Sequence, residues 1–121
     1  PEDQLTDLSE RLIAAEITRE RLFLELRQEL PYASAVETDR WQEQKDGSVR
    51  VEQTIHVERA SQKAIVLGKG GQQVKRIGEL ARAEMERGFG RRVHLFLFVR
   101  VTEGWADSRE HLAAFGLDDD G

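Results

Sequence analysis

The sequence predicts an α+β fold in which a three-stranded mixed sheet carries helices on one face, in the order α-β-β-α-α-β-α. Three observations lead to this prediction. Residues 49–57 and 93–101 alternate apolar and polar side chains, as half-buried strands do. An Asp-Gly pair at residues 46–47 indicates a hairpin turn before the first of these strands. Segments with helical periodicity lie before, between and after the strands.

The first predicted element is a helix over residues 8–30. Its apolar residues recur at spacings of three, four and seven, which places them on one stripe. The stripe consists of Leu8, Leu12, Ala15, Leu22 and Leu26. Pro31 ends the helix, because a proline pushes the preceding residue out of the helical region.

An antiparallel hairpin follows. Residues 33–44 form its first strand, with Val36 and Trp41 as the larger apolar members, and residues 49–57 form the second. Alternation in the second strand places one face against a core and leaves the other without one. The expected core face holds Val49, Val51, Ile55 and Val57, and the other face holds Arg50, Glu52, Thr54 and His56.

Two helices separated by glycines come next. Ser61 is the expected cap of a short helix over residues 62–67, and a longer helix covers residues 72–87 until Gly88 and Gly90 end it. The apolar stripe of the longer helix is Val74, Ile77, Ala81 and Met85.

The strand over residues 93–101 is the strongest in the chain. A helical crossover joins it to the second strand, so the two should be parallel neighbours with a right-handed connection. Phe96 and Phe98 then lie on the face that one layer of helices leaves uncovered, where they pack under Trp41 or form a contact patch. A last helix is expected over residues 107–115.

Composition narrows the classes of function. The chain has 121 residues and no cysteine, which suits one domain in a reducing compartment such as the cytoplasm. It shows no signal peptide or membrane-spanning run, and it begins without Met, so we expect a fragment of a longer protein. We find no nucleophile–base pair and no metal cluster, and expect neither catalysis nor a cofactor from this chain.

Charge is concentrated around the glycines. The net charge is −5, but residues 59–92 hold nine Lys or Arg and three Glu, a net of +6. At the centre of this basic segment lies Gly68-Lys69-Gly70-Gly71. A glycine-rich turn with a lysine, placed before a helix, is typical of a site that binds phosphate.

Several phosphate-binding motifs do not match this turn. A nucleotide P-loop needs Ser or Thr after the lysine, where this chain has Gly70. A dinucleotide fingerprint needs glycine where this chain has Gln73. Residues 87–90, Arg-Gly-Phe-Gly, begin like the RRM signature, but Arg91 follows where an aromatic residue is required.

A Gly-x-x-Gly loop between two helices, after two strands and before a third, resembles a KH domain, and the helix-first order resembles its type II form. The resemblance implies that the loop clamps the backbone of single-stranded RNA while bases lie on apolar residues beside it. Basic residues on the neighbouring helices and on the turn at 88–92 complete the expected site. The expected RNA-binding residues are Lys63, Ile65, Val66, Gly68, Lys69, Gly70, Gly71, Lys75, Arg76, Ile77, Arg91 and Arg92.

Longer segments are similar to the C-terminal KH domain of the Era family of GTPases. They are LTD at 5–7, Glu16, Arg19 and Glu20, ELPY at 29–32, HVERxSQKAIVLGKGGQQVKRIG at 56–78, and Trp105 with Asp107. The resemblance implies binding to the 3′ end of small-subunit ribosomal RNA, a role in ribosome assembly on the small ribosomal subunit, and an upstream GTPase domain in cis. The charge of −5 and the acidic end argue against the membrane binding sometimes ascribed to this family.

On this basis residues 1–7 are expected to be a linker from an upstream domain, 8–116 the KH domain, and 117–121 a loose acidic tail. The alternative function is a protein-interaction domain that keeps the KH fold without binding RNA, with Phe96 and Phe98 as its contact surface. His56 and His94 are expected to be surface residues, and Trp41 a packing residue.

Overall fold

The computed structural model of the chain describes residues 2–26 and 34–104. Its elements, in order, are the helix α1 (Glu2–Leu26), the strands β1 (Ser34–Glu43) and β2 (Val49–Val57), the helix α2 (Ala60–Leu67), the 3-10 turn η1 (Lys69–Gly71), the helix α3 (Gln72–Phe89) and the strand β3 (Val93–Val101). The α+β class and this order are confirmed, whereas the predicted helix at 107–115 lies outside the described residues.

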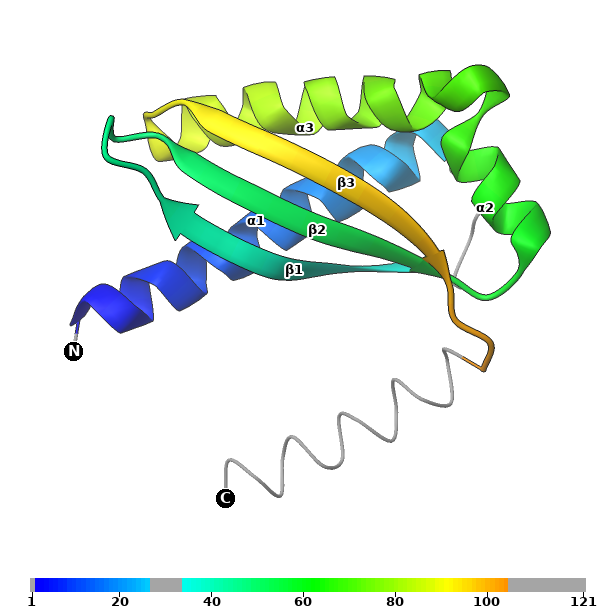
Figure 1. Cartoon of the computed structure of the whole chain (residues 1–121), viewed down its shortest axis with the longest axis horizontal. Coiled ribbons are helices and arrows are strands. Elements are labelled where there is room, and N and C mark those ends of the chain that lie inside the picture. Colours follow the sequence, from blue (N-terminus) through cyan, green and yellow to red (C-terminus); the bar gives the residue numbers. More distant parts are fainter. Residues whose placement is uncertain (1, 27–33, 105–121) are drawn as a thin grey trace.

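The sheet has the predicted mixed topology. Its strand order is β1-β2-β3, with β1 antiparallel to β2 and β2 parallel to β3. Figure 1 shows α1 and α3 behind the sheet and α2 at one end of it, so the helices cover one face. The parallel pairing follows from the helical crossover, which returns the chain to the same end of the sheet.

The hairpin turn forms where the Asp-Gly pair predicted it. Gly47 has φ +88°, and the amide of Ser48 and its hydroxyl both donate to Asp46 Oδ1, at 3.0 and 2.6 Å. These bonds lower the pKa of Asp46, with the side-chain bond from Ser48 as the larger cause. The carboxylate of Asp46 is therefore committed to holding the turn.

The core lies between the sheet and the helices. The inward side chains of β2 are fully buried, and they join the predicted stripe of α3 and Leu22 and Leu26 of α1. The predicted core faces of β2 and α3 are confirmed, except that Val74 is only half-buried.

The predicted stripe of α1 was wrong at Leu12. Leu12 is 69% exposed, and from residue 9 onward the buried residues of α1 are Ala14, Thr18, Leu22 and Leu26, which repeat every four residues. The helix also begins at Glu2 instead of residue 8. The apolar pattern does not include Thr18, because Thr18 is polar. Its hydroxyl is nevertheless hydrogen-bonded inside the core, to Gln53.

Three smaller predictions were also wrong. The N-cap of α2 is Arg59 instead of Ser61. The side-chain oxygen of Gln62 accepts hydrogen bonds from the backbone amides of Glu58 and Arg59, so the helix begins before Ser61. Gly88 lies within α3, and Gly90, with φ +70°, ends that helix. His56 is only 7% exposed, because its ring nitrogens lie 3.1 Å from Glu37 Oε1 and Thr102 Oγ1.

The aromatic residues decide between two alternatives that the sequence left open. Trp41 packs edge-on against Phe89 on the helix side, with ring centres 5.5 Å apart, so its role in packing is confirmed. Phe96 and Phe98 point to the other face and are 40% and 54% exposed. They therefore do not pack under Trp41.

A buried polar network joins α1 to the hairpin. Thr18 Oγ1 donates to Gln53 Oε1 at 2.6 Å, and Gln53 Nε2 donates to Thr38 Oγ1 at 3.1 Å. Thr38 also donates its hydroxyl to the carbonyl of Arg11, whose guanidinium donates back to the carbonyl of Thr38. Since Thr18 and Gln53 are both fully buried, their bonds fix which face of α1 meets the sheet.

We expect Thr18→Val to lower the free energy of unfolding by about 1–3 kcal/mol, because it leaves the buried amide oxygen of Gln53 without a donor. The double variant Thr18→Val with Gln53→Leu should recover part of this loss, since no orphaned partner remains across that contact. Urea denaturation measures both. Equal stability of Thr18→Val and the parent would contradict the assignment.

Candidate nucleic-acid interface

The Gly-x-x-Gly turn connects α2 to α3 in a conformation that requires glycine. Gly68 has φ +70° and ψ 178°, a region that residues with a side chain essentially never occupy. A Cβ on Gly68 would lie 2.6 Å from Gln73 Cβ and 3.0 Å from Gln73 N. The first glycine is therefore fixed by the close crossing of the two helices.

The later glycines have a different role. Gly70 and Gly71 both adopt the left-handed conformation, with φ +64° and +77°, and a Cβ on either would meet nothing within 4 Å. They turn the chain while leaving its surface open to a ligand. Lys69 and Gly70 are exposed, and no ion-pair partner of Lys69 is found in the described part of the chain.

Backbone amides at this turn are available to an anion. The amides of Gly68 and Gly71 are used inside the turn, by Ala64 O and Gly68 O. The amide of Gln72 likewise donates to Lys69 O. The next amides of the first turn of α3 have no partner within their own helix, and the helix dipole adds a partial positive charge there. With the Lys69 ammonium beside them, these groups form a site for one or more phosphates.

A groove between α3 and β3 begins at Val74, three residues after the loop. It has a volume of about 320 Å³, with Val74, Gly78 and Leu97 among its lining residues, and its charged residues are Lys75, Glu79 and Arg82. A Cβ on Gly78 would lie 3.5 Å from Leu97 Cδ1, so the glycine keeps this part of the groove open. β3 ends the sheet on this side, and its outer edge has no strand partner among the described residues.

Some of the predicted site residues are in the core. Val66 and Ile77 are fully buried in the cluster with Leu22 and Ile55, and Ile65 packs against the same cluster. Val66 and Ile77 therefore do not form the groove floor, and that prediction was wrong. Both belong to the helix faces that hold the fold together, which apolar character alone did not distinguish from a ligand surface.

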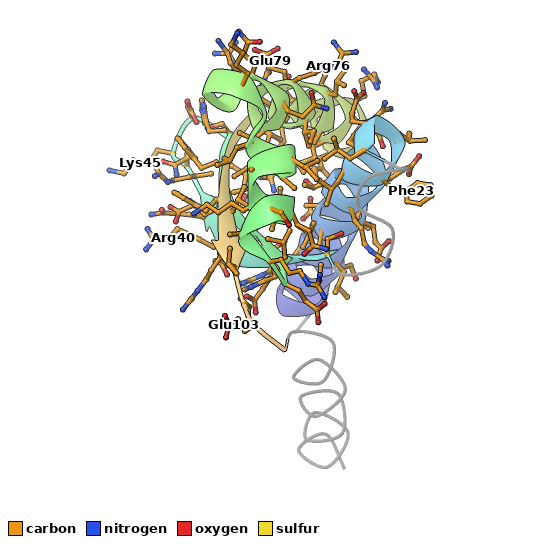
Figure 2. All side chains as sticks on the ribbon, turned by 90° about the vertical axis from the view of Figure 1, so that its right-hand side faces the viewer. Phe23, Arg40, Lys45, Arg76, Glu79 and Glu103 are labelled. Carbon is orange, nitrogen blue, oxygen red and sulfur yellow. The ribbon has the colours of Figure 1, made fainter. Side chains whose placement is uncertain are left out.

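The predicted cations separate into different surroundings. Lys75 is exposed on the groove side of α3, whereas Arg76 forms an ion pair with Glu25 of α1 at 3.1 Å. Lys63 is half-buried on α2. Figure 2 shows Arg76 and Glu79 at the outer surface of α3, away from the core. Lys69 and Lys75 are therefore the cations best placed for the loop and the groove.

Arg91 and Arg92 follow the far end of α3, about 27 Å from its start at 1.5 Å per residue. Arg91 forms an ion pair with Glu43 and another with Glu10 at 3.6 Å, and the bond from Arg91 is the largest cause lowering the pKa of Glu43. Arg92 is exposed beside a second hollow between α3 and β3. The structure thus does not bring Arg91 to the loop.

Sequence reasoning missed the groove residues Gly78 and Leu97. A glycine inside a helical pattern opposite a strongly apolar strand would have indicated them. In the described residues no group of three or more His, Cys, Asp or Glu could hold a metal ion. None of the described helices combines the length and apolarity that a bilayer crossing requires.

Comparison with known proteins agrees with this architecture. A KH domain family model matches residues 29–106. GTPase Era of Sinorhizobium medicae is 60% identical over 118 residues, which are 98% of this chain and 38% of that protein. GTPase Era of Brucella suis biovar 1 is 58% identical with the same coverage. The chain thus spans a little over a third of the length of these relatives.

Solved structures of Era share the fold. A variant of Aquifex aeolicus Era bound to GDP and aluminium fluoride superposes with a TM-score of 0.79, at 37% identity over 88% of this chain and 36% of that one. Era in complex with MgGDPNP and nucleotides 1506–1542 of 16S ribosomal RNA gives 0.78, at the same identity and coverage. This chain belongs to the KH domain family, and its domain is of the kind that Era GTPases carry.

Proposed function

We propose that this chain binds single-stranded RNA, with the sugar–phosphate backbone at Gly68–Gly71 and the bases in the groove between α3 and β3. The observation that carries the proposal is the open turn, in which Lys69 carries the only side chain between Gly68 and Gly71, next to a largely apolar groove that begins at Val74. Glycines let a phosphate approach the main chain closely, and unstacked bases find an apolar surface beside it.

The groove supplies both parts of a base-reading site. Val74, Gly78 and Leu97 offer apolar contact to base faces. The free edge of β3 offers main-chain donors and acceptors, which can hydrogen-bond to base edges. Because Gly78 carries no side chain, a base can lie close to the axis of α3. The binding needs no metal or cofactor.

The relatives indicate the target. An Era protein with the same KH fold was crystallised with nucleotides 1506–1542 of 16S ribosomal RNA. We propose that this chain binds the 3′ end of small-subunit ribosomal RNA during ribosome assembly in the cytoplasm. We also propose that it acts as the RNA-binding part of a GTPase whose nucleotide domain accounts for much of the relatives' remaining length.

Replacing Lys69 and Gly70 together by Asp should reduce affinity for RNA at least about 100-fold. The change puts two carboxylates where phosphate is expected, and both positions are exposed with space around Gly70. Asp tolerates the left-handed conformation better than most residues, so the fold should persist. Fluorescence anisotropy with a 12-nucleotide RNA from the 3′ end of 16S ribosomal RNA measures affinity, and circular dichroism monitors folding.

A matched control is Arg87→Asp with Gly88→Asp, which makes the same change in charge at exposed positions near the other end of α3. This variant should bind RNA within about threefold of the parent, because screening weakens its charges over that distance. Equal losses in both variants would indicate only a response to net charge. Parent-like binding by the loop variant would contradict the proposed site.

Binding should also weaken with salt. Contacts to two or three phosphates predict a slope of about −1.5 to −2 for the logarithm of the association constant against the logarithm of salt concentration. Titrations between 50 and 300 mM KCl measure it. A slope near zero would mean that phosphates contribute little, and would count against the loop as the anchor.

A further inference from the structure

The outer face of the sheet, opposite the helices, holds two exposed aromatic side chains, and both of them also border the groove between α3 and β3. Phe96 and Phe98 are 40% and 54% exposed and lie two residues apart on β3, about 6.6 Å along the strand. Burying such rings against a ligand is favourable, and a pair of them on one strand offers a surface on which flat groups stack.

Phe96 connects this face to the groove. It is one of the residues that line the groove between α3 and β3, and it also lines a hollow of about 610 Å³ on the hairpin side, with Lys45, Arg50 and His94. An RNA strand that leaves the groove can therefore pass over the Phe96 ring and stay in contact with the protein as it reaches the outer face.

The charges on this face suit a polyanion. The guanidinium of Arg50 lies 4.2 Å from the centre of the Phe96 ring. Lys45 and Arg100 are exposed, and neither of these two has a carboxylate partner in the described residues. β3 contains no acidic residue. Figure 2 shows Lys45 and Arg40 projecting on this side of the sheet, opposite Phe23 of α1.

The carboxylates here are already committed to neighbours within the face. Glu52 pairs with Arg50 at 2.9 Å and Arg40 at 3.7 Å, and Asp46 accepts two bonds from Ser48. Asp39 accepts from Thr54, and Glu37 lies against His56. Their charge is thus partly compensated before any ligand arrives.

We propose that RNA emerging from the groove continues over the outer face of β3, with bases stacked on Phe96 and Phe98 and phosphates near Arg50, Lys45 and Arg100. This extension rests on the proposed RNA-binding function. A protein partner fits the face less well, because among the described residues of this face the large exposed apolar side chains are Phe96 and Phe98, in a surface that is otherwise mostly charged. The outer side of α1, where Leu12, Ile13, Phe23 and Leu24 are 44–69% exposed, is the more apolar surface.

The test compares a four-nucleotide and a 12-nucleotide RNA from the 3′ end of 16S ribosomal RNA by fluorescence anisotropy. A KH groove holds about four nucleotides, so the shorter RNA meets the two rings only where they border the groove, and the longer RNA also reaches the outer face. We expect Phe96→Leu with Phe98→Leu to weaken binding of the 12-mer at least about tenfold more than binding of the 4-mer, since stacking needs a ring. Phe96→Tyr with Phe98→Tyr should keep parent affinity for both.

The matched control is Leu12→Ala with Phe23→Ala, which removes exposed apolar groups from α1 and should leave both affinities unchanged. Thermal unfolding confirms that each variant is folded. Parent-like binding of the 12-mer by the Leu variant, or an equal loss for both RNAs, would overturn the extension. The extension would also be overturned if Phe96→Leu with Phe98→Leu bound RNA as the parent does but no longer bound a purified protein that the parent binds.

The two proposals fail differently. If the parent binds neither RNA, or if the variant with Asp at residues 69 and 70 binds both as the parent does, the loop site is wrong and the extension falls with it. If Lys69→Asp with Gly70→Asp abolishes binding of both RNAs while Phe96→Leu with Phe98→Leu binds both as the parent does, only the extension is wrong.

Discussion

The close crossing of α2 and α3 at Gly68 is the constraint on which the rest of the structure depends. The backbone of Gly68 lies where a side chain would collide with Gln73, so at this point the end of α2 lies directly against the start of α3. Gly70 and Gly71 follow with open space where their side chains would be. From this point α3 runs beside β3, and the groove lies between the two elements.

The sheet carries this geometry to the binding surface. Within the described residues β3 pairs with β2 alone and lies at the edge of the sheet, and the alternation of its side chains separates two surfaces. Leu95 and Leu97 face the helices, whereas Phe96 and Phe98 face away from them. One strand thereby borders the groove on one side and an aromatic, basic face on the other.

Much of the fold could be predicted because local signals agreed. The Asp-Gly turn, the alternation in β2 and β3 and the glycines between two helices each fixed an element and its direction. Thr18 could not be recognised as a core residue, because its burial depends on Gln53, which is 35 positions away. His56 likewise lies among partners on other segments. The loop was found from its composition, but the floor of the groove was not. Ile77 and Val74 are both apolar and sit on one helix, and only packing places the first in the core and the second beside the ligand surface.

The central claim is that the glycine turn holds the RNA backbone, and amide chemical shifts test it most directly. On addition of a four-nucleotide single-stranded RNA to the ¹⁵N-labelled chain, the largest shifts should fall on residues 68–75 and on the edge strand β3, with α1 unchanged. Shifts concentrated on α1 or on the β1–β2 hairpin, with the glycine amides unmoved at saturating RNA, would contradict the account.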